Sequence, residues 1–344
     1  MLTYASRRAF VNGMDDIVGR PVLTMAQECS REWRFRDWKS CEYSLRSEWD
    51  YVVGRAEAQA GCTAGTRDVR NGGKTPEDFL AEANALIAER REAGHGLALP
   101  DAHAYLSRDE VIAVRLYSGP AYQLINGFLR QVARLDGAHR VALARSLALS
   151  FAATVGHVCR AIRKLAAIAT PEEAAAPLYR GVRGELPNSF WVADEQGLVC
   201  ATDTAFMSTS RNRKTPIEYM GGGTNVLWEL EPKVEDDTAY HNGAPISMLS
   251  QFAEEDEVLY PPCTMLRVKR RDEGESSVKS PEKSPSPGKN SRLRKASTVA
   301  MAFSRPSSSM RESDGGGGQA ELQVVETREE GKSFVAIRVE PAFV

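Results

Sequence analysis

The spacing of hydrophobic residues predicts helices in the first half of the chain and strands in the second. Between residues 76 and 168, apolar side chains recur every three or four positions, as they do on one face of an α-helix. From residue 178 onward, they occur in runs of four to seven residues between Gly, Pro and Asn clusters, which is typical of strands. Helices followed by strands favour an α+β fold over a wound parallel sheet.

Two helix starts carry residues that cap a helix. Residues 75–78 read TPED, which supplies Thr as N-cap, Pro in the first turn and two acids near the positive end of the helix dipole. Gly94 ends this helix. Residues 107–110 read SRDE, a capping box ahead of the apolar run VIAVRLY. Gly119-Pro120 breaks the second helix, and helical periodicity then resumes.

The later part of the chain contains several predicted strands and a predicted hairpin. The hairpin turns at residues 329–332, EEGK. The single strands are LYRGV (178–182), AFMSTS (205–210), NVLWELE (225–231), EVLY (257–260) and TMLRV (264–268).

Residues 269–320 differ from the rest of the chain. They are rich in Ser, Pro and Gly and have almost no large apolar side chains, so we expect them to be disordered. Eleven basic and four acidic residues lie between Lys269 and Arg311. Serines that precede proline or follow an Arg-x-x pattern make Ser/Thr kinases expected partners of this segment. These serines are Ser280, Ser284, Ser286 and Ser297.

Charge and cysteine content exclude several classes of protein. The net charge of −2 gives no global field that would attract nucleic acid. No apolar run is long enough to span a membrane, and we find neither a secretory signal nor a lipid-anchor tail. The six cysteines lie far apart without CxxC or Cys/His spacing, so we expect no metal site and reduced thiols. These features predict a cytoplasmic protein.

Three short segments carry side chains suited to chemistry. The first strand contains Arg180, and the second contains the hydroxyls of residues 208–210, Ser-Thr-Ser. Glu255 and Glu257 stand within the run EEDEVLYPP, and residues two apart on a strand face the same side. We therefore expect both carboxylates to enter one site, with Asp256 facing away.

Each segment has an ordinary interpretation when taken alone. Ser-Thr-Ser on a strand is commonly cross-strand packing, and an acidic run is commonly a solvated turn. The arginine, the hydroxyls and Glu-x-Glu in this order, each on a predicted strand, are rare by chance. In this combination the chain resembles the arginine-specific mono-ADP-ribosyltransferases, which share an R–S–E-x-E signature and include vertebrate ecto-enzymes and clostridial binary toxins.

The resemblance is carried by Arg180, Ser208, Glu255 and Glu257, and it extends upstream through LSRDEVIAVRLYSGPAYQLINGFLR (106–130). It implies a helical N-terminal part followed by two packed antiparallel β-sheets that form an NAD cleft. The ecto-enzymes' secretion signals, anchors and disulfides have no counterpart visible here, so their location is not implied. The domains implied are a helical extension of unknown role (1–104), a catalytic domain (105–268), the disordered insert (269–320) and final catalytic strands (321–344).

The same resemblance implies roles for the two carboxylates and the serine. NAD is the substrate, and no metal takes part. Glu257 would bind the ribose 2′-hydroxyl and stabilise the positive charge that develops as nicotinamide leaves. Ser208 would hold that carboxylate. Glu255 would accept a proton from the acceptor's guanidinium, which is fully protonated at neutral pH and therefore a poor nucleophile.

Further binding residues are expected around these groups. Arg180 would pair with the NAD phosphates, and Gly181 would let the backbone approach nicotinamide. Thr209 and Ser210 are included with Ser208 as cofactor-binding residues. Tyr219 would stack on nicotinamide or simply pack as an ordinary tyrosine. In the loop before Glu255, which would present an arginine-bearing acceptor protein, Phe252 is the expected contact.

Two alternatives use the same residues. Water as acceptor would make the protein an NAD glycohydrolase, and loss of turnover would leave an inert NAD-binding signalling module. All four signature residues are present, which argues against the inert module. The sequence does not separate transfer from hydrolysis.

Overall fold

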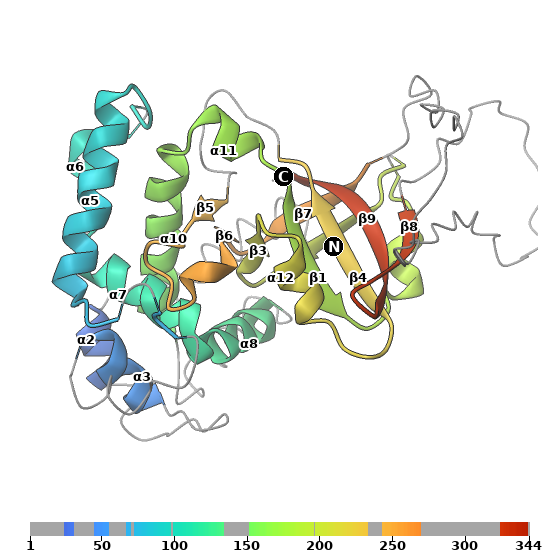
Figure 1. The fold of residues 1–344 in the computed structure, drawn as a ribbon, viewed down its shortest axis with the longest axis horizontal. Helices are drawn as coiled ribbons and strands as arrows, with labels where there is room; N and C mark the ends of the chain where they lie inside the picture. The colour runs from blue at the N-terminus through green and yellow to red at the C-terminus, as the bar shows by residue number, and fades with distance from the viewer. Residues whose placement is uncertain are drawn as a thin grey trace, which may run out of the picture.

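The computed structural model describes residues 24–30, 45–54, 67–69, 72–97, 99–133, 151–195, 197–232, 243–269 and 324–342. The predicted disordered insert therefore lies outside the described residues, apart from Lys269. Helices gather at one end of the molecule and strands at the other (Figure 1). The helical elements are α2 (Met25–Glu28), α3 (Leu45–Val52), α5 (Pro76–Glu92), α6 (Asp101–Ala104), α7 (Arg108–Leu116), the π-helical turn η2 (Tyr117–Ala121), α8 (Tyr122–Ala133), α10 (Ala152–Ala167), α11 (Pro171–Ala175), α12 (Lys214–Glu218) and the 3₁₀ turns η3 (Asn188–Trp191) and η4 (Ala253–Glu255).

Both predicted helix starts are confirmed by their hydrogen bonds. The Thr75 hydroxyl accepts from the Asp78 amide and the Asp78 carboxylate accepts from the Thr75 amide, a closed capping box at the start of α5. Ser107 and Glu110 form the same arrangement at α7. The break at Gly119-Pro120 is also present, since Gly119 has non-helical backbone angles within η2, although α8 begins directly afterwards.

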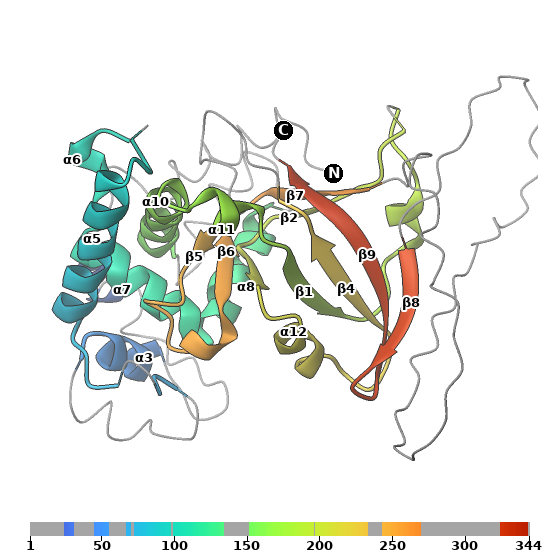
Figure 2. The ribbon, with the colours of Figure 1, turned by 45° about the horizontal axis from the view of Figure 1, so that its top comes forward.

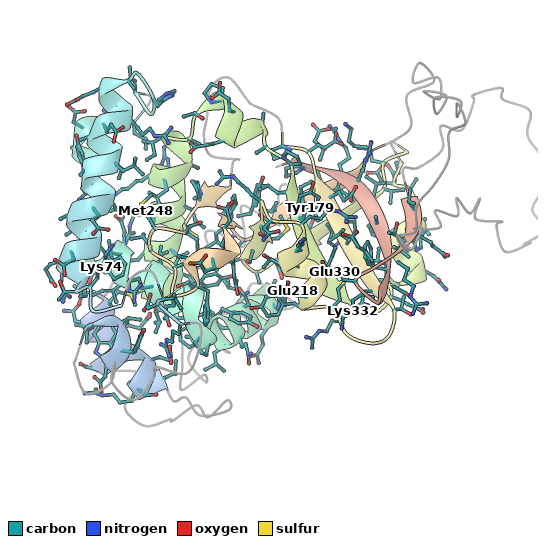
Figure 3. The ribbon with its side chains drawn as sticks, viewed as in Figure 1. Lys74, Tyr179, Glu218, Met248, Glu330 and Lys332 are labelled. Atoms are coloured by element: carbon teal, nitrogen blue, oxygen red, sulfur yellow. The ribbon has the colours of Figure 1, made fainter. Side chains whose placement is uncertain are left out.

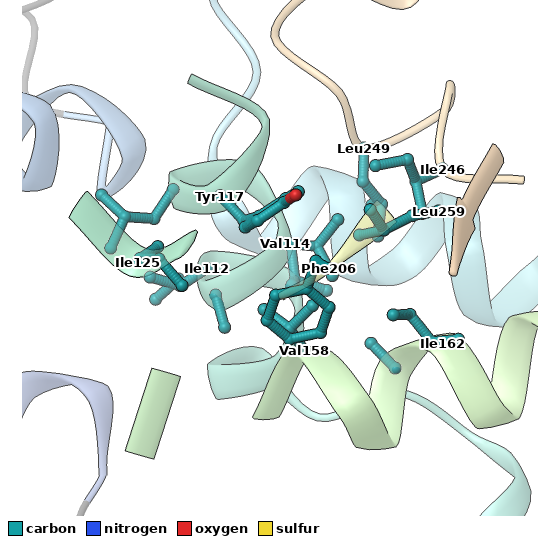
Figure 4. Packing of buried hydrophobic residues seen from close by; sticks show 14 of the residues in the cluster. Ile112, Val114, Tyr117, Ile125, Val158, Ile162, Phe206, Ile246, Leu249 and Leu259 are labelled. Atoms are coloured by element: carbon teal, nitrogen blue, oxygen red, sulfur yellow. The ribbon is translucent and has the colours of Figure 1, made fainter. Parts of the chain in front are cut away.

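Helices from both sides of residue 104 share one hydrophobic core. Phe79, Ala83 and Ile87 of α5 pack in the same cluster as the apolar side chains of α7 and α10. Figure 4 shows part of this cluster, in which Phe206, the residue before β3, lies among helical residues. The predicted boundary between a helical extension and a catalytic domain stays a prediction, and the packing is continuous across it.

Glu28 of α2 caps another helix from a distance. Its buried carboxylate accepts from the amides of Ala153 and Thr154 at 2.6 and 3.1 Å, and from the Thr154 hydroxyl at 2.5 Å. The N-cap residue of α10, Phe151, has no side chain able to do this. The N-terminal region therefore satisfies amides at the positive end of a helix in the main core.

The nine described strands form one hydrogen-bonded sheet in the order β2-β7-β9-β4-β1-β3-β6-β5, with β8 paired to β9. All pairs are antiparallel except β4 and β9. The strands are β1 (Leu178–Arg183), β2 (Cys200–Asp203), β3 (Met207–Ser210), β4 (Asn225–Leu230), β5 (Ala244–Pro245), β6 (Glu257–Tyr260), β7 (Thr264–Val268), β8 (Val324–Glu329) and β9 (Lys332–Ala342).

The two expected sheets are seen as two groups of strands joined at one point. β1 and β3 share a single residue pair, Tyr179 with Ser210, whereas β1 and β4 are paired along six residues. The group β3-β6-β5 thus turns away toward the helices, while β1 and β4 continue toward β8 and β9 (Figure 2).

The predicted hairpin is confirmed at its turn. Glu329 pairs with Lys332, and Glu330 and Gly331 both have positive φ, as a two-residue type I′ turn requires. Figure 3 marks Glu330 and Lys332 at this tip, on the sheet side of the molecule. The hairpin pairs β8 with β9, and β9 also pairs with β4 and β7 in the larger strand group.

Candidate active site

Arg180, Ser208 and Glu257 come from three neighbouring strands, β1, β3 and β6. Glu257 is paired with Ser210, and Ser208 lies two residues along β3 on the same face. The hydroxyl of Ser208 forms a hydrogen bond with the Glu257 carboxylate. The sheet therefore brings the predicted arginine, serine and second glutamate together.

Glu257 is a buried carboxylate in this group. Its side chain is almost inaccessible to water, and burial raises its pKa to about 7. The nearby Glu255 carboxylate raises this pKa further, whereas the hydrogen bond from Ser208 and the charge of Arg180 oppose the rise. This carboxyl therefore gains or loses its proton close to neutral pH, a perturbation typical of functional sites.

Glu255 reaches the site by a different backbone route from the one predicted. We expected Glu255 and Glu257 on one strand, but Glu255 ends the turn η4 and Asp256 has a left-handed backbone, with φ of 46°. The strand begins only at Glu257. The predicted strand alternation is wrong for Glu255, because a 3₁₀ turn and a left-handed residue precede the strand.

The Asp256 carboxylate pairs with Arg211 and accepts a hydrogen bond from the Ser247 hydroxyl. Glu255 is instead bonded to Tyr219, whose hydroxyl donates to Oε1 over 2.5 Å. Burial raises the pKa of Glu255, and this hydrogen bond from Tyr219 opposes the rise. Tyr219 as a whole is 58% exposed, so an exposed aromatic residue lies beside the carboxylate.

Arg180 is held by two acceptors. Its Nη1 donates to the Ser208 carbonyl at 2.8 Å, and its Nη2 pairs with the Asp203 carboxylate at 3.1 Å. Arg130 of α8 pairs with the same carboxylate at 3.2 Å. Asp203 thus stands between two guanidinium groups beside the site.

The remaining predicted residues have other contacts. Thr209 is buried, faces the opposite side of β3 from Ser208 and donates to the Val258 carbonyl at 2.7 Å. The Ser210 hydroxyl donates to the Glu255 carbonyl at 2.6 Å, so it fixes the backbone of a candidate residue. A Cβ on Gly181 would lie 2.7 Å from the Pro216 carbonyl oxygen, so the missing side chain also lets α12 pack against β1. Partly buried Phe252 immediately precedes η4.

Sequence reasoning missed Asp203, Arg130, Tyr117 and Asn126. The Tyr117 hydroxyl accepts from Asn126 at 3.2 Å, and the Glu257 charge acts on Tyr117, which places this pair beside the site. Asn126 Oδ1 is buried and has no hydrogen-bond partner among the described residues. The signal that could have pointed to Asn126 is a polar residue on the otherwise apolar face of the predicted helix within residues 106–130.

Two negative findings apply to the part of the chain that the structure describes. There, no three His, Cys, Asp or Glu side chains gather in a way that would hold a metal ion. No helix within the described ranges combines the length and apolar character needed to cross a membrane. The cytoplasmic location stays a prediction.

Comparisons with known proteins give one family match and several similar structures. A family model described as NAD:arginine ADP-ribosyltransferase matches residues 76–285. The chain is similar to ADP-ribosyltransferase HopU1 of Pseudomonas syringae pv. Tomato DC3000, at 15% identity and a TM-score of 0.39, over 88% of this chain and 99% of that chain. It is also similar to ADP-ribosyltransferase Vis of Vibrio splendidus in complex with agmatine, at 17% identity and a TM-score of 0.39, over 79% and 87%. No curated protein gives a significant match.

Proposed function

Because a family model covers more than half of it, this chain belongs to the NAD:arginine ADP-ribosyltransferase family, and on that premise we propose how its side chains transfer ADP-ribose from NAD to arginine. When bound, NAD supplies the ADP-ribosyl group, and its nicotinamide leaves. The observation that carries the proposal is the buried Glu257 carboxylate, with Ser208 bonded to it and Glu255 close by. The two carboxylates then have separate tasks.

Glu257 stabilises the positive charge that develops at the ribose. Its burial supports this role, because a carboxylate away from water interacts with a developing charge more strongly than a solvated one. The hydrogen bond from Ser208 holds the carboxylate in one orientation, and therefore the site does not need to reorganise during the reaction.

Glu255 accepts the proton that the acceptor's guanidinium must lose. A free guanidinium keeps its proton at neutral pH, so an adjacent base is needed as the new bond forms. Tyr219 supports this task by donating to one oxygen of Glu255, which leaves the other oxygen for the acceptor. We further propose that the exposed Tyr219 ring and Phe252 contact the nicotinamide or the acceptor.

Arg180 binds the diphosphate of NAD, and Gly181 lets β1 approach the substrate closely. The pairing of Arg180 and Arg130 with one carboxylate, Asp203, supports a site for an anion, because two cations are already gathered there. The unpartnered Asn126 oxygen and the Tyr117 hydroxyl add polar atoms for the substrate beside Glu257. Thr209 and Ser210, which we predicted to bind NAD, act through the backbone of the site.

The acceptor is an arginine-bearing protein. Incubation with labelled NAD and agmatine or polyarginine tests this proposal. We expect the label on the acceptor, whereas free ADP-ribose alone would support hydrolysis and contradict transfer to arginine.

We also propose Ser/Thr kinases as partners that act on residues 269–320, on the basis of the serine motifs alone. Each phosphate adds a charge of about −1.5 to −2 at neutral pH, so four would nearly neutralise the basic segment. Treatment with a proline-directed and a basophilic kinase, followed by mass spectrometry, should find phosphate on Ser284 and Ser297. Absence of both would contradict the proposal.

A further inference from the structure

We propose that Asp68 and Arg115 are positioning residues for Glu255. They hold residues 249–251, one residue before η4, and through that loop they set where the Glu255 carboxylate meets an acceptor. This inference rests on the proposed function, since it assigns a remote support to a carboxylate with a proposed role. It also gives the N-terminal helical region a task in the transfer reaction.

The amides of Leu249 and Ser250 donate to the Ile246 carbonyl within the loop itself, and three further backbone contacts come from the helical region. The Leu249 carbonyl accepts from Arg115 Nη1 at 3.0 Å. The Gln251 amide donates to the Ser118 hydroxyl at 3.0 Å, and the Gln251 carbonyl accepts from the Asp68 amide at 2.6 Å. Three successive contacts from outside the sheet thus fix the path of the chain just before η4.

Asp68 contributes with both its backbone and its side chain. Its carboxylate accepts from Arg115 Nη2 at 2.7 Å and from the Tyr51 hydroxyl at 2.6 Å, and it is buried. Its φ is +50°, a left-handed conformation that costs energy for most side chains but that Asp and Asn tolerate better. Such a conformation is kept where the surroundings impose it, here by the amide contact to Gln251.

Arg115 connects the two halves of this arrangement. Its side chain is 2% exposed, pairs with Asp68 and lies over the Phe79 ring at 4.0 Å. Its own carbonyl accepts from Gln251 Nε2 at 2.7 Å. Beside it, the buried side chains of Arg67 and Glu48 form a bidentate ion pair at 2.7 and 3.0 Å. The loop is therefore supported by buried charged groups.

Two other anchors complete the support of η4. Upstream, Ile246 and Leu249 enter the hydrophobic core, where Figure 4 shows them near Leu259. Downstream, the Ser210 hydroxyl holds the Glu255 carbonyl. Only residues 252–254 lie between the anchors, and this segment ends at Glu255. A shift of Gln251 therefore passes to Glu255 through a single short turn.

The position of Glu255 matters for transfer more than for hydrolysis. The base must touch the guanidinium as the bond forms, and a displacement of about 1 Å costs roughly 10²-fold in rate. Hydrolysis, in which water is the acceptor, involves no guanidinium that must lose a proton to Glu255. Loosening the support should therefore lower the ratio of agmatine modification to NAD hydrolysis, whereas general destabilisation should lower both rates together.

The test uses the full chain with Asp68→Asn, which removes the charge and keeps a residue that tolerates the left-handed backbone. The ratio of transfer to hydrolysis should fall by about tenfold or more. Amide hydrogen exchange in a peptide covering residues 247–257 should become faster in the absence of NAD, a readout that does not depend on activity. Tyr51→Phe removes only the hydroxyl bonded to Asp68. It should also lower the ratio and speed up the exchange, but by smaller amounts than Asp68→Asn.

Glu28→Gln is the matched control. It removes the charge of another buried carboxylate in the N-terminal region, one that contacts α10 and not residues 249–251. It should therefore lower the melting temperature and leave the ratio of transfer to hydrolysis unchanged. An unchanged ratio in Asp68→Asn, or an equal fall in Glu28→Gln, overturns the inference. If Asp68→Asn does not fold, an unchanged ratio in Tyr51→Phe overturns it. Failure of the wild-type protein to modify agmatine would contradict the proposed function. In that case the exchange rate of residues 247–257 in Asp68→Asn still tests whether Asp68 holds the loop.

Discussion

The hydroxyl of Tyr219 donates to the Glu255 carboxylate over 2.5 Å, and this contact joins the end of α12 to the turn before β6. The two residues are far apart in sequence, and neither side chain is held on a strand. Burial raises the pKa of Glu255, while the Tyr219 hydroxyl lowers it. The tyrosine therefore helps to keep the proposed base ionised.

Tyr219→Phe should reduce transfer to agmatine by roughly tenfold, the size expected for loss of one hydrogen bond to a charged group. Without the hydroxyl, the pKa of Glu255 should rise. A base must be deprotonated to act, so the acidic limb of the pH profile for transfer should move to higher pH. The pH profile for NAD hydrolysis, measured on the same preparation, should stay in place. A shift of both limbs would show that Tyr219 acts on a step common to both reactions.

Glu257→Gln should abolish transfer and hydrolysis alike, because both reactions develop positive charge at the ribose. Removal of one pre-organised electrostatic contact costs on the order of 10²–10³ in rate. Initial rates with agmatine and with water alone measure the two activities. Retention of more than about a tenth of either rate would contradict the role assigned to Glu257.

The same substitution should change the pH dependence of stability. The pKa of Glu257 is raised from 4.5 to about 7 in the folded protein, so the proton it keeps stabilises the fold fully below about pH 4.5. That contribution is lost as pH rises through 7, by on the order of 3 kcal/mol. Unfolding in denaturant should therefore show wild type losing stability relative to Glu257→Gln between pH 4.5 and 8. A constant difference across this range would mean that the carboxyl titrates normally.

Glu255→Gln should separate the two activities. Transfer to agmatine should fall by on the order of 10²-fold or more, because general base catalysis contributes about 10²–10⁴. Hydrolysis of NAD should survive. Glu254→Gln, a neighbouring exposed acid in the same turn, is the control and should leave both rates near wild type. Equal loss of transfer and hydrolysis in Glu255→Gln is the result that would contradict a separate base.

Five single strands, the final hairpin and both helix starts were predictable from local patterns, whereas the short strands β2 and β5 were not predicted. Residues such as Ser107 and Glu110 bond within four positions, so their capping is encoded where it occurs. The turn at Glu330-Gly331 is equally local. The order of the signature residues along the chain was enough to indicate the strands that meet at Glu257.

The remaining features depend on contacts between distant segments. Asp203 shows no sequence signal, and its importance comes from two arginines that α8 and β1 bring to it. The left-handed backbone at Asp256 breaks the strand alternation that we used for Glu255. Asp68 and Arg115, 47 positions apart, pair only because α7 and the segment before α5 fold together. Such pairings follow from tertiary packing and have no periodicity to find.

The single residue pair between β1 and β3 has a consequence for substrate binding. At that seam the Arg180 side chain reaches across and bonds to the Ser208 carbonyl, so a guanidinium replaces the next rung of the backbone ladder. A diphosphate that draws Arg180 toward itself competes with this rung, whose net contribution is about 1 kcal/mol. Under the role proposed for Arg180, part of the binding free energy of the diphosphate is therefore used to replace this contact between β1 and β3.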